Sequence, residues 1–321
     1  MSPPLRRLPL FFVLAMMFSL LLLNLSVVSY FCLYLLKPLF GVENPDAISR
    51  GQLVSSADIN AFLFLQAVSS IGGFVLTAIL MIKLETGYVI SSLKFNRLPA
   101  LRLFILGIIT ILIAQFFIEF LVTVNEQLPF SSKMLDLIKK VQADEARLTN
   151  QLLGVKSFGM FLVVGFVFSV VPAIGEEMFF RGLLLGTLLK RKVHPVAAII
   201  ASGFFFAIAH FQFTNTLAIW VLGSFLGYLY YVSGSLWLPV AAHFINNFLS
   251  VLLKYLYNIG VISTDVTDTA TPWYITLASF VLFFGCLYLF NKWKERFDTG
   301  EDDDDSNEDE LATNENVLDT P

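Results

Sequence analysis

The feature that most constrains this chain is a series of eight apolar segments, most of them long enough to cross a lipid bilayer. A membrane-spanning helix needs about 20 predominantly apolar residues, and only 14% of the 321 residues are charged. A backbone surrounded by lipid must satisfy its own hydrogen bonds, so such segments form helices. We predict an all-α polytopic membrane protein with about eight transmembrane helices, near residues 9–36, 59–83, 100–124, 157–190, 195–212, 214–232, 236–257 and 273–292.

Basic side chains gather in alternate connections between these segments. Cytoplasmic connections of membrane proteins carry an excess of Lys and Arg. An even number of crossings then predicts a multi-pass protein of the cell membrane with both termini in the cytoplasm. We expect the lipid bilayer as a partner and no nucleic acid. The clusters assigned to the cytoplasm are Arg6 and Arg7; Lys83, Lys94, Arg97 and Arg102; Lys190, Arg191 and Lys192; and Lys292, Lys294 and Arg296.

Two further segments differ from the apolar helices. Within the long connection 125–156, apolar residues recur at helical spacing among charged ones, which predicts an amphipathic helix. It either lies on the outer membrane surface or packs on the helical bundle. Residues 298–321 carry 11 acidic and no basic side chains, which predicts a disordered tail. We divide the chain into N-terminal helices with the amphipathic loop (1–150), a core (151–258), a last helix (259–297) and the acidic tail (298–321).

Three ionisable residues interrupt the fourth apolar segment. At about 2.5–3.5 kcal/mol each, Glu176, Glu177 and Arg181 together would cost about 8–10 kcal/mol at the centre of a bilayer. Glu177 and Arg181 are four residues apart and can pair on one helix face. Glu176 points about 100° away and has no local partner, which suits a general base or acid. At about 50 Å, this segment also exceeds the bilayer core, so it must tilt, project, or break near Pro172 and Gly175.

Two of the three histidines also lie in apolar segments. His210 follows Phe206 by four residues, and His243 precedes Asn247 by four, so each pair shares a helix face. Counted from the cytoplasmic ends of their helices at ~1.5 Å per residue, Glu176 and His210 lie at similar depths, ~21 and ~22 Å. His243 and Asn247 lie lower, at ~10 and ~16 Å, unless the fourth and fifth helices project into the cytoplasm by a turn or two. Glu176, His210, His243 and Asn247 are therefore our candidate catalytic residues.

Three motifs in this order resemble those of the CPBP family, which includes type II CAAX prenyl endopeptidases, bacteriocin-processing proteins and abortive-infection-like membrane proteins. They are Glu176-Glu177-x-x-x-Arg181, Phe206-x-x-x-His210 and His243-x-x-x-Asn247. The resemblance implies an intramembrane endopeptidase that cleaves a membrane-associated protein or peptide. In this family Glu176 and His210 would activate water, and His243 and Asn247 would stabilise the oxyanion. Glu177, Arg181 and Phe206 would support the site.

Three other functions stay open. Two His and two Glu side chains could bind zinc, although the chain lacks the His-Glu-x-x-His motif of common zinc peptidases; we expect no cofactor, and metal dependence is the alternative. Gly223-Ser224-Phe225-Leu226-Gly227 could supply a rhomboid-like serine, although packing by small residues explains this segment better. A non-catalytic scaffold, immunity factor or transporter-like protein would keep the polar cluster for shape.

Overall fold

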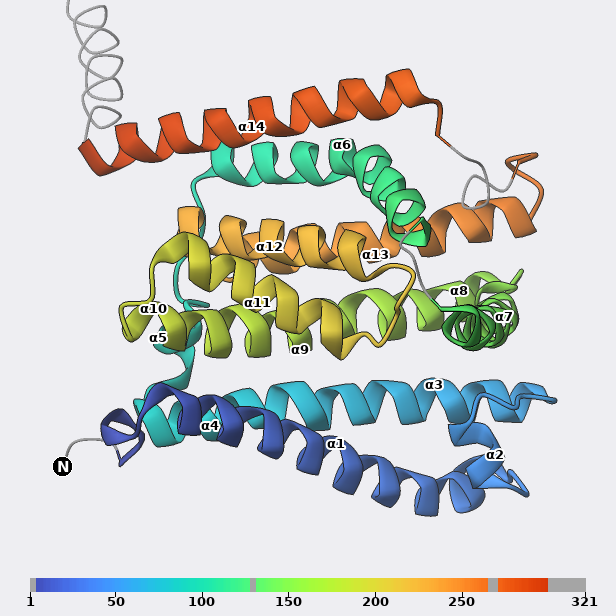
Figure 1. The fold of residues 1–321 in the computed structure, drawn as a ribbon. Helices are drawn as coiled ribbons and strands as arrows, with labels where there is room; N and C mark the ends of the chain where they lie inside the picture. The colour runs from blue at the N-terminus through green and yellow to red at the C-terminus, as the bar shows by residue number, and fades with distance from the viewer. Residues whose placement is uncertain (1–3, 128–130, 265–270, 300–321) are drawn as a thin grey trace, which may run out of the picture.

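The structure is a computed structural model that describes residues 4–127, 131–264 and 271–299. This part of the chain forms helices and no strands, which confirms the all-α prediction. Figure 1 shows the long helices stacked nearly parallel, with helix α7 crossing one end of the bundle. The main α-helices are α1 (Leu10–Phe40), α3 (Ser56–Ser70), α4 (Leu76–Glu85), α6 (Leu101–Glu126), α7 (Ser132–Leu153), α8 (Phe158–Gly165), α9 (Val171–Glu177), α11 (Pro195–Ala209), α12 (Thr216–Ser233), α13 (Trp237–Asn258) and α14 (Trp273–Thr299).

Shorter elements complete the bundle. Three π-helical stretches continue neighbouring α-helices without a break: η2 (Ile71–Val75), η3 (Phe166–Val170) and η4 (Met178–Leu185). The remaining elements are η1 (Pro4–Arg7), α2 (Pro45–Ser49), α5 (Val89–Leu93) and α10 (Gly186–Lys190).

Six helices within the described ranges are long and apolar enough to cross a membrane: Leu10–Phe40, Ser56–Glu85, Leu101–Asn125, Phe158–Lys190, Thr216–Ser233 and Trp273–Trp293. The protein is therefore an integral membrane protein. Helix α11 is apolar but shorter, and α13 has the length but carries polar side chains along it. Crossings by these two helices would give the predicted eight, and that number stays a prediction.

The fourth apolar segment is one helical run of 33 residues, from Phe158 to Lys190. It does not break near Pro172 and Gly175, which we had considered. Instead η3 ends directly before α9, and Pro172 occupies the first turn of α9. A π-helical turn widens the backbone and so accommodates a proline that cannot donate a hydrogen bond. Glu176 and Arg181 therefore lie on the same uninterrupted helical run.

Helix α7 is the amphipathic helix that the sequence predicts. Its first turn is capped by the Ser131 hydroxyl, which accepts a hydrogen bond from the Met134 N–H at 3.3 Å. Its apolar face buries Ile138 and Leu152, and α7 contacts α8 and α13. The structure shows α7 packed across the end of the bundle (Figure 1), and its position on the outer membrane surface stays a prediction.

Helices α11 and α12 cross with their backbones in close approach. A Cβ atom added to Gly203 would lie 2.6 Å from the Ser224 backbone nitrogen, and one added to Gly223 would lie 3.1 Å from the Gly203 Cα. The two backbones therefore approach at a distance that only glycine permits. This contact fixes α11, which carries Phe206 and ends at His210, against the helix that follows it.

Candidate active site

The candidate site is built around a buried ion pair in the fourth helical run. Arg181 and Glu177 have no exposed side-chain surface, and Arg181 Nη1 donates to Glu177 Oε1 at 2.6 Å. The guanidinium also donates through Nη2 to the Gly223 carbonyl oxygen at 2.8 Å and lies 4.4 Å from the centre of the Phe206 ring. These contacts offset part of the cost of two charges in a dry interior, although Glu177 Oε2 and Arg181 Nε have no hydrogen-bond partner among the described residues. They also tie the fourth run to α11 and α12.

Glu176 and His210 form a second, more accessible pair. His210 Nε2 lies 3.8 Å from Glu176 Oε2, and the two side chains are 29% and 13% exposed. His210 Nδ1 lies 2.8 Å from the Phe206 carbonyl oxygen. A carbonyl only accepts hydrogen bonds, so Nδ1 carries a proton, and Nε2 is the ring nitrogen that faces Glu176. Glu176 Oε2 is itself buried without a hydrogen-bond partner among the described residues.

The chain bends sharply just beyond His210. His210 caps the end of α11, and the next residue, Phe211, has a φ of 54°. A bulky residue in the left-handed region is strained and is found most often at functional sites. Asn125 of α6 then secures the bend, because its side chain donates to the Phe213 carbonyl at 2.7 Å and accepts from the Leu217 N–H at 3.1 Å.

His243 contacts the inner of the two glutamates. Its Nδ1 lies 2.8 Å from Glu177 Oε1, so Glu177 accepts from both Arg181 and His243. The ring is 3% exposed. The depth counted from the sequence put His243 below Glu176 unless the fourth and fifth helices project by a turn or two, and the contact with Glu177 brings His243 to the level of the fourth helical run.

The start of α13 is in fact covered by the segment that precedes α6. The Trp237 indole donates to the Phe95 carbonyl at 2.9 Å, and the Ser235 hydroxyl donates to the Arg97 carbonyl at 2.6 Å. These contacts fix the start of α13 against the segment before α6, and His243 lies at the level of Glu177.

Phe206 connects the two pairs of polar residues. It is buried, and the centre of its ring lies 4.5 Å from the centre of the His210 ring and 5.8 Å from that of His243. The two imidazoles thus flank one aromatic ring. Phe206 limits the freedom of both histidines and accepts the His210 hydrogen bond through its backbone.

Asn247 lies one turn beyond His243 on α13. Its Nδ2 donates to the Phe168 carbonyl of η3 at 3.2 Å, which uses one of the two N–H bonds of the amide. Asn247 and Phe168 also line a cavity of about 230 Å³, which Thr149, Leu152 and Leu153 of α7 close on the other side. The structure therefore places Asn247 between His243 and the amphipathic helix.

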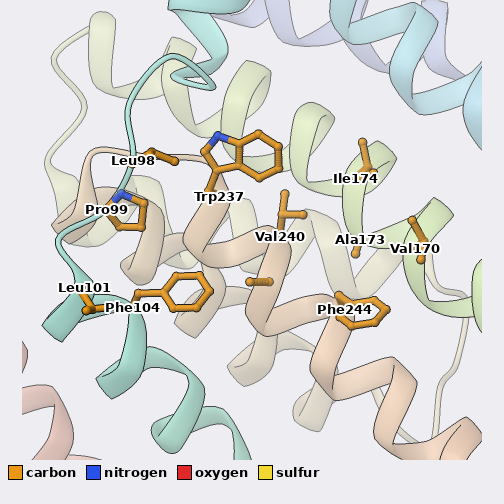
Figure 2. Close-up of a pocket in the computed structure, with 11 residues that line it drawn as sticks. Leu98, Pro99, Leu101, Phe104, Val170, Ala173, Ile174, Trp237, Val240 and Phe244 are labelled. Atoms are coloured by element: carbon orange, nitrogen blue, oxygen red, sulfur yellow. The ribbon is translucent and has the colours of Figure 1, made fainter.

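A larger apolar cavity, of about 460 Å³, lies nearer the start of α13 (Figure 2). It is bounded by the segment leading into α6, by η3 and α9, and by α13. Val240 and Phe244 of α13 line it next to His243, and Ala173 and Ile174 line it one turn before Glu176 and Glu177. An apolar group in this cavity would therefore lie beside the polar site.

Two alternatives can be compared with this geometry. The described residues contain no group of three or more His, Cys, Asp or Glu side chains that could hold a metal ion together. Ser224 lies at the crossing of α11 and α12, where its backbone faces Gly203. It therefore serves the helix packing that small residues permit.

These features define a helical membrane protein with two Glu–His pairs in its interior. Residues 158–249, under a third of the chain, match the family model described as type II CAAX prenyl endopeptidase Rce1-like. The match confirms the CPBP resemblance of the three motifs and supports an intramembrane endopeptidase with a membrane-associated substrate. Neither the curated proteins nor the solved structures gave a match.

Several contacts of the site were not predicted from the sequence. The Gly223 carbonyl binds Arg181 from another helix, and a backbone acceptor leaves no trace in a single sequence. Gln115 and Asn246, which connect to Asn247, were also missed. They could have been noticed, because Gln115 is an isolated polar side chain in a membrane segment and Asn246 directly precedes Asn247.

Proposed function

We propose that the protein is an intramembrane endopeptidase in which Glu176 and His210 activate water to cleave a peptide bond near the membrane. The observation that carries the proposal is the Glu176 carboxylate, whose buried Oε2 faces Nε2 of His210 across 3.8 Å. In the proposed mechanism this Nε2 acts as a hydrogen-bond acceptor. That distance is too long for a direct hydrogen bond. It suits a bridging water, which would donate one hydrogen to each acceptor and turn its lone pairs toward a substrate carbonyl.

The proposed reaction then follows glutamate-type hydrolysis. The water oxygen bonds to the carbonyl carbon, its proton passes to Glu176, and the carbonyl oxygen becomes an oxyanion. The C–N bond breaks as Glu176 returns the proton to the leaving amine. Preorganised donors in a water-poor site stabilise the oxyanion far better than bulk water does.

His243 and Asn247 are the proposed oxyanion donors. Asn247 has one N–H bond left after its contact with Phe168. His243 Nδ1 donates to Glu177, so Nε2 donates only when the ring carries both protons. The Glu177 carboxylate would stabilise that imidazolium. This role explains why Glu177 binds His243 as well as Arg181.

The apolar cavity shown in Figure 2 supports a substrate with a lipid-like or strongly apolar part. A prenylated CAAX-type peptide is one such substrate, and an apolar membrane peptide is another. In this proposal the apolar part binds beside Val240 and Phe244, and the scissile bond lies at the level of His243. We also propose that residues 151–258 form the core that cleaves, within a cell-membrane protein whose termini are cytoplasmic.

The test is the Glu176→Gln variant, assayed by proteomics of membrane peptides and by cleavage of candidate peptides with purified protein. Cleavage should fall below detection while the melting temperature stays unchanged. A suitable control is Glu119→Gln. Glu119 is another carboxylate in a membrane helix, but it binds Thr271 outside the site. Unchanged cleavage by Glu176→Gln would refute the proposal, and inhibition by a chelator would support the metal-dependent alternative.

A further inference from the structure

Three side-chain amides form a continuous chain from α6 through α13 to η3. Gln115 Nε2 donates to Asn246 Oδ1 at 2.9 Å, and Asn246 Nδ2 donates to Asn247 Oδ1 at 3.0 Å. Asn247 Nδ2 then donates to the Phe168 carbonyl at 3.2 Å. Gln115 Nε2 also donates to the Ile111 carbonyl of its own helix at 3.2 Å. This series of hydrogen-bonded amides therefore begins and ends at backbone carbonyls.

These two carbonyls fix the direction of every amide between them. A carbonyl accepts and never donates, so Gln115 must turn its nitrogen toward Ile111, and Asn247 must turn its nitrogen toward Phe168. Rotation of any one amide by 180° would place N–H against N–H or oxygen against oxygen. In a partly buried setting, such a mismatch costs the full desolvation penalty of the unpaired groups.

We propose that Gln115 and Asn246 are positioning residues that keep the Asn247 amide nitrogen directed at the reacting carbonyl. The inference rests on the proposed function, because it assigns the orientation of one of its oxyanion donors. A freely rotating Asn247 would spend part of its time with its oxygen toward the oxyanion and would then repel it. The neighbouring amides remove that orientation without touching the substrate.

The first test observes Asn247 directly. In protein labelled with 15N-asparagine, the Asn247 side-chain resonances can be assigned by their loss in Asn247→Ala. We expect Gln115→Leu to shift them and to speed the exchange of their protons with water. Identical resonances in Gln115→Leu would overturn the proposal, and this measurement does not depend on any catalytic activity.

The second test uses kinetics. Gln115→Leu should lower kcat by about tenfold with KM unchanged, less than the ~10²–10³-fold loss expected when an oxyanion donor is removed outright. In an Asn247→Ala background the same substitution should have no further effect, because its target is gone. An equal loss in that background, or a change in KM alone, would contradict a positioning role.

A matched control lies five residues away on α6. The buried Thr110 hydroxyl donates to the Leu106 carbonyl outside the amide chain, so Thr110→Val should leave kcat and the Asn247 resonances unchanged. A loss in Thr110→Val equal to that in Gln115→Leu would indicate general damage to α6 and overturn the proposal. Cleavage that survives Glu176→Gln would instead refute the proposed function, while the resonance test would still decide the orientation of Asn247.

Discussion

At the scale of single residues, Glu177 and Arg181 hold the site together, while Glu176 and His210 remain available for chemistry. The two pairs differ in their hydrogen-bond partners. Glu177 accepts from two side chains, and Arg181 donates to Glu177 and to the Gly223 carbonyl. The sequence predicted the Glu177–Arg181 pair because four residues make one helical turn. It could not predict the contact between His243 and Glu177, which are 66 residues apart and meet only through packing.

Loss of Arg181 should therefore damage stability before it damages chemistry. We expect Arg181→Met to destabilise the protein by about 3–5 kcal/mol, because it leaves the Glu177 charge buried without its main partner. The measurement is the melting temperature and yield in detergent. The double variant Arg181→Met/Glu177→Gln removes both charges and should recover much of that loss. A double variant no more stable than Arg181→Met would show that the unpaired Glu177 charge does not cause the loss of stability.

At the scale of helices, the position of His210 depends on the crossing of α11 and α12. The sequence indicated that Gly223, Ser224 and Gly227 serve packing, but it did not identify Gly203 as the opposing residue. Such a partner depends on the register between two helices, which is set by tertiary contacts. The π-helical stretches were likewise not predicted, because an apolar helical pattern does not distinguish a π-helical turn from an α-helical one.

The Gly203→Ala variant tests this dependence. The added methyl group would collide with Ser224, so α11 must move away from α12. We expect overpacking to cost about 1–3 kcal/mol or more, with a loss of cleavage as His210 leaves Glu176. Gly285 of α14 is the control, because a Cβ there meets nothing within 4 Å, and Gly285→Ala should melt and cleave like the parent. If Gly203→Ala melts and cleaves like the parent, neither stability nor cleavage depends on the close contact between α11 and α12.

At the scale of the whole molecule, the start of α1 and the end of α14 lie at the same end of the bundle, and α7 lies at the opposite end (Figure 1). This arrangement agrees with an even number of crossings. The apolar segments largely matched the observed helices, since hydrophobicity and length alone decide membrane insertion. The acidic tail at 298–321 lies almost wholly outside the described residues.

Labelling from outside the cell tests the orientation. Lys140 is exposed on α7, and His194 is exposed in the turn before α11, at the other end of the bundle. We expect a membrane-impermeant maleimide to label Lys140→Cys in intact cells and His194→Cys only after lysis. Cys32 and Cys286 are buried and should give little background. The reverse pattern would place the termini outside.

The short hairpin of α11 and α12 has a consequence for the surrounding lipid. Helix α11 has 15 residues and is therefore ~22 Å long, less than the ~30 Å hydrocarbon core. A bilayer meets a short helix by thinning around it. If α11 crosses the bilayer as predicted, we expect the headgroup layer to dip toward the end of α11 at His210, which would let hydrolytic water reach a site that long neighbouring helices would otherwise keep dry.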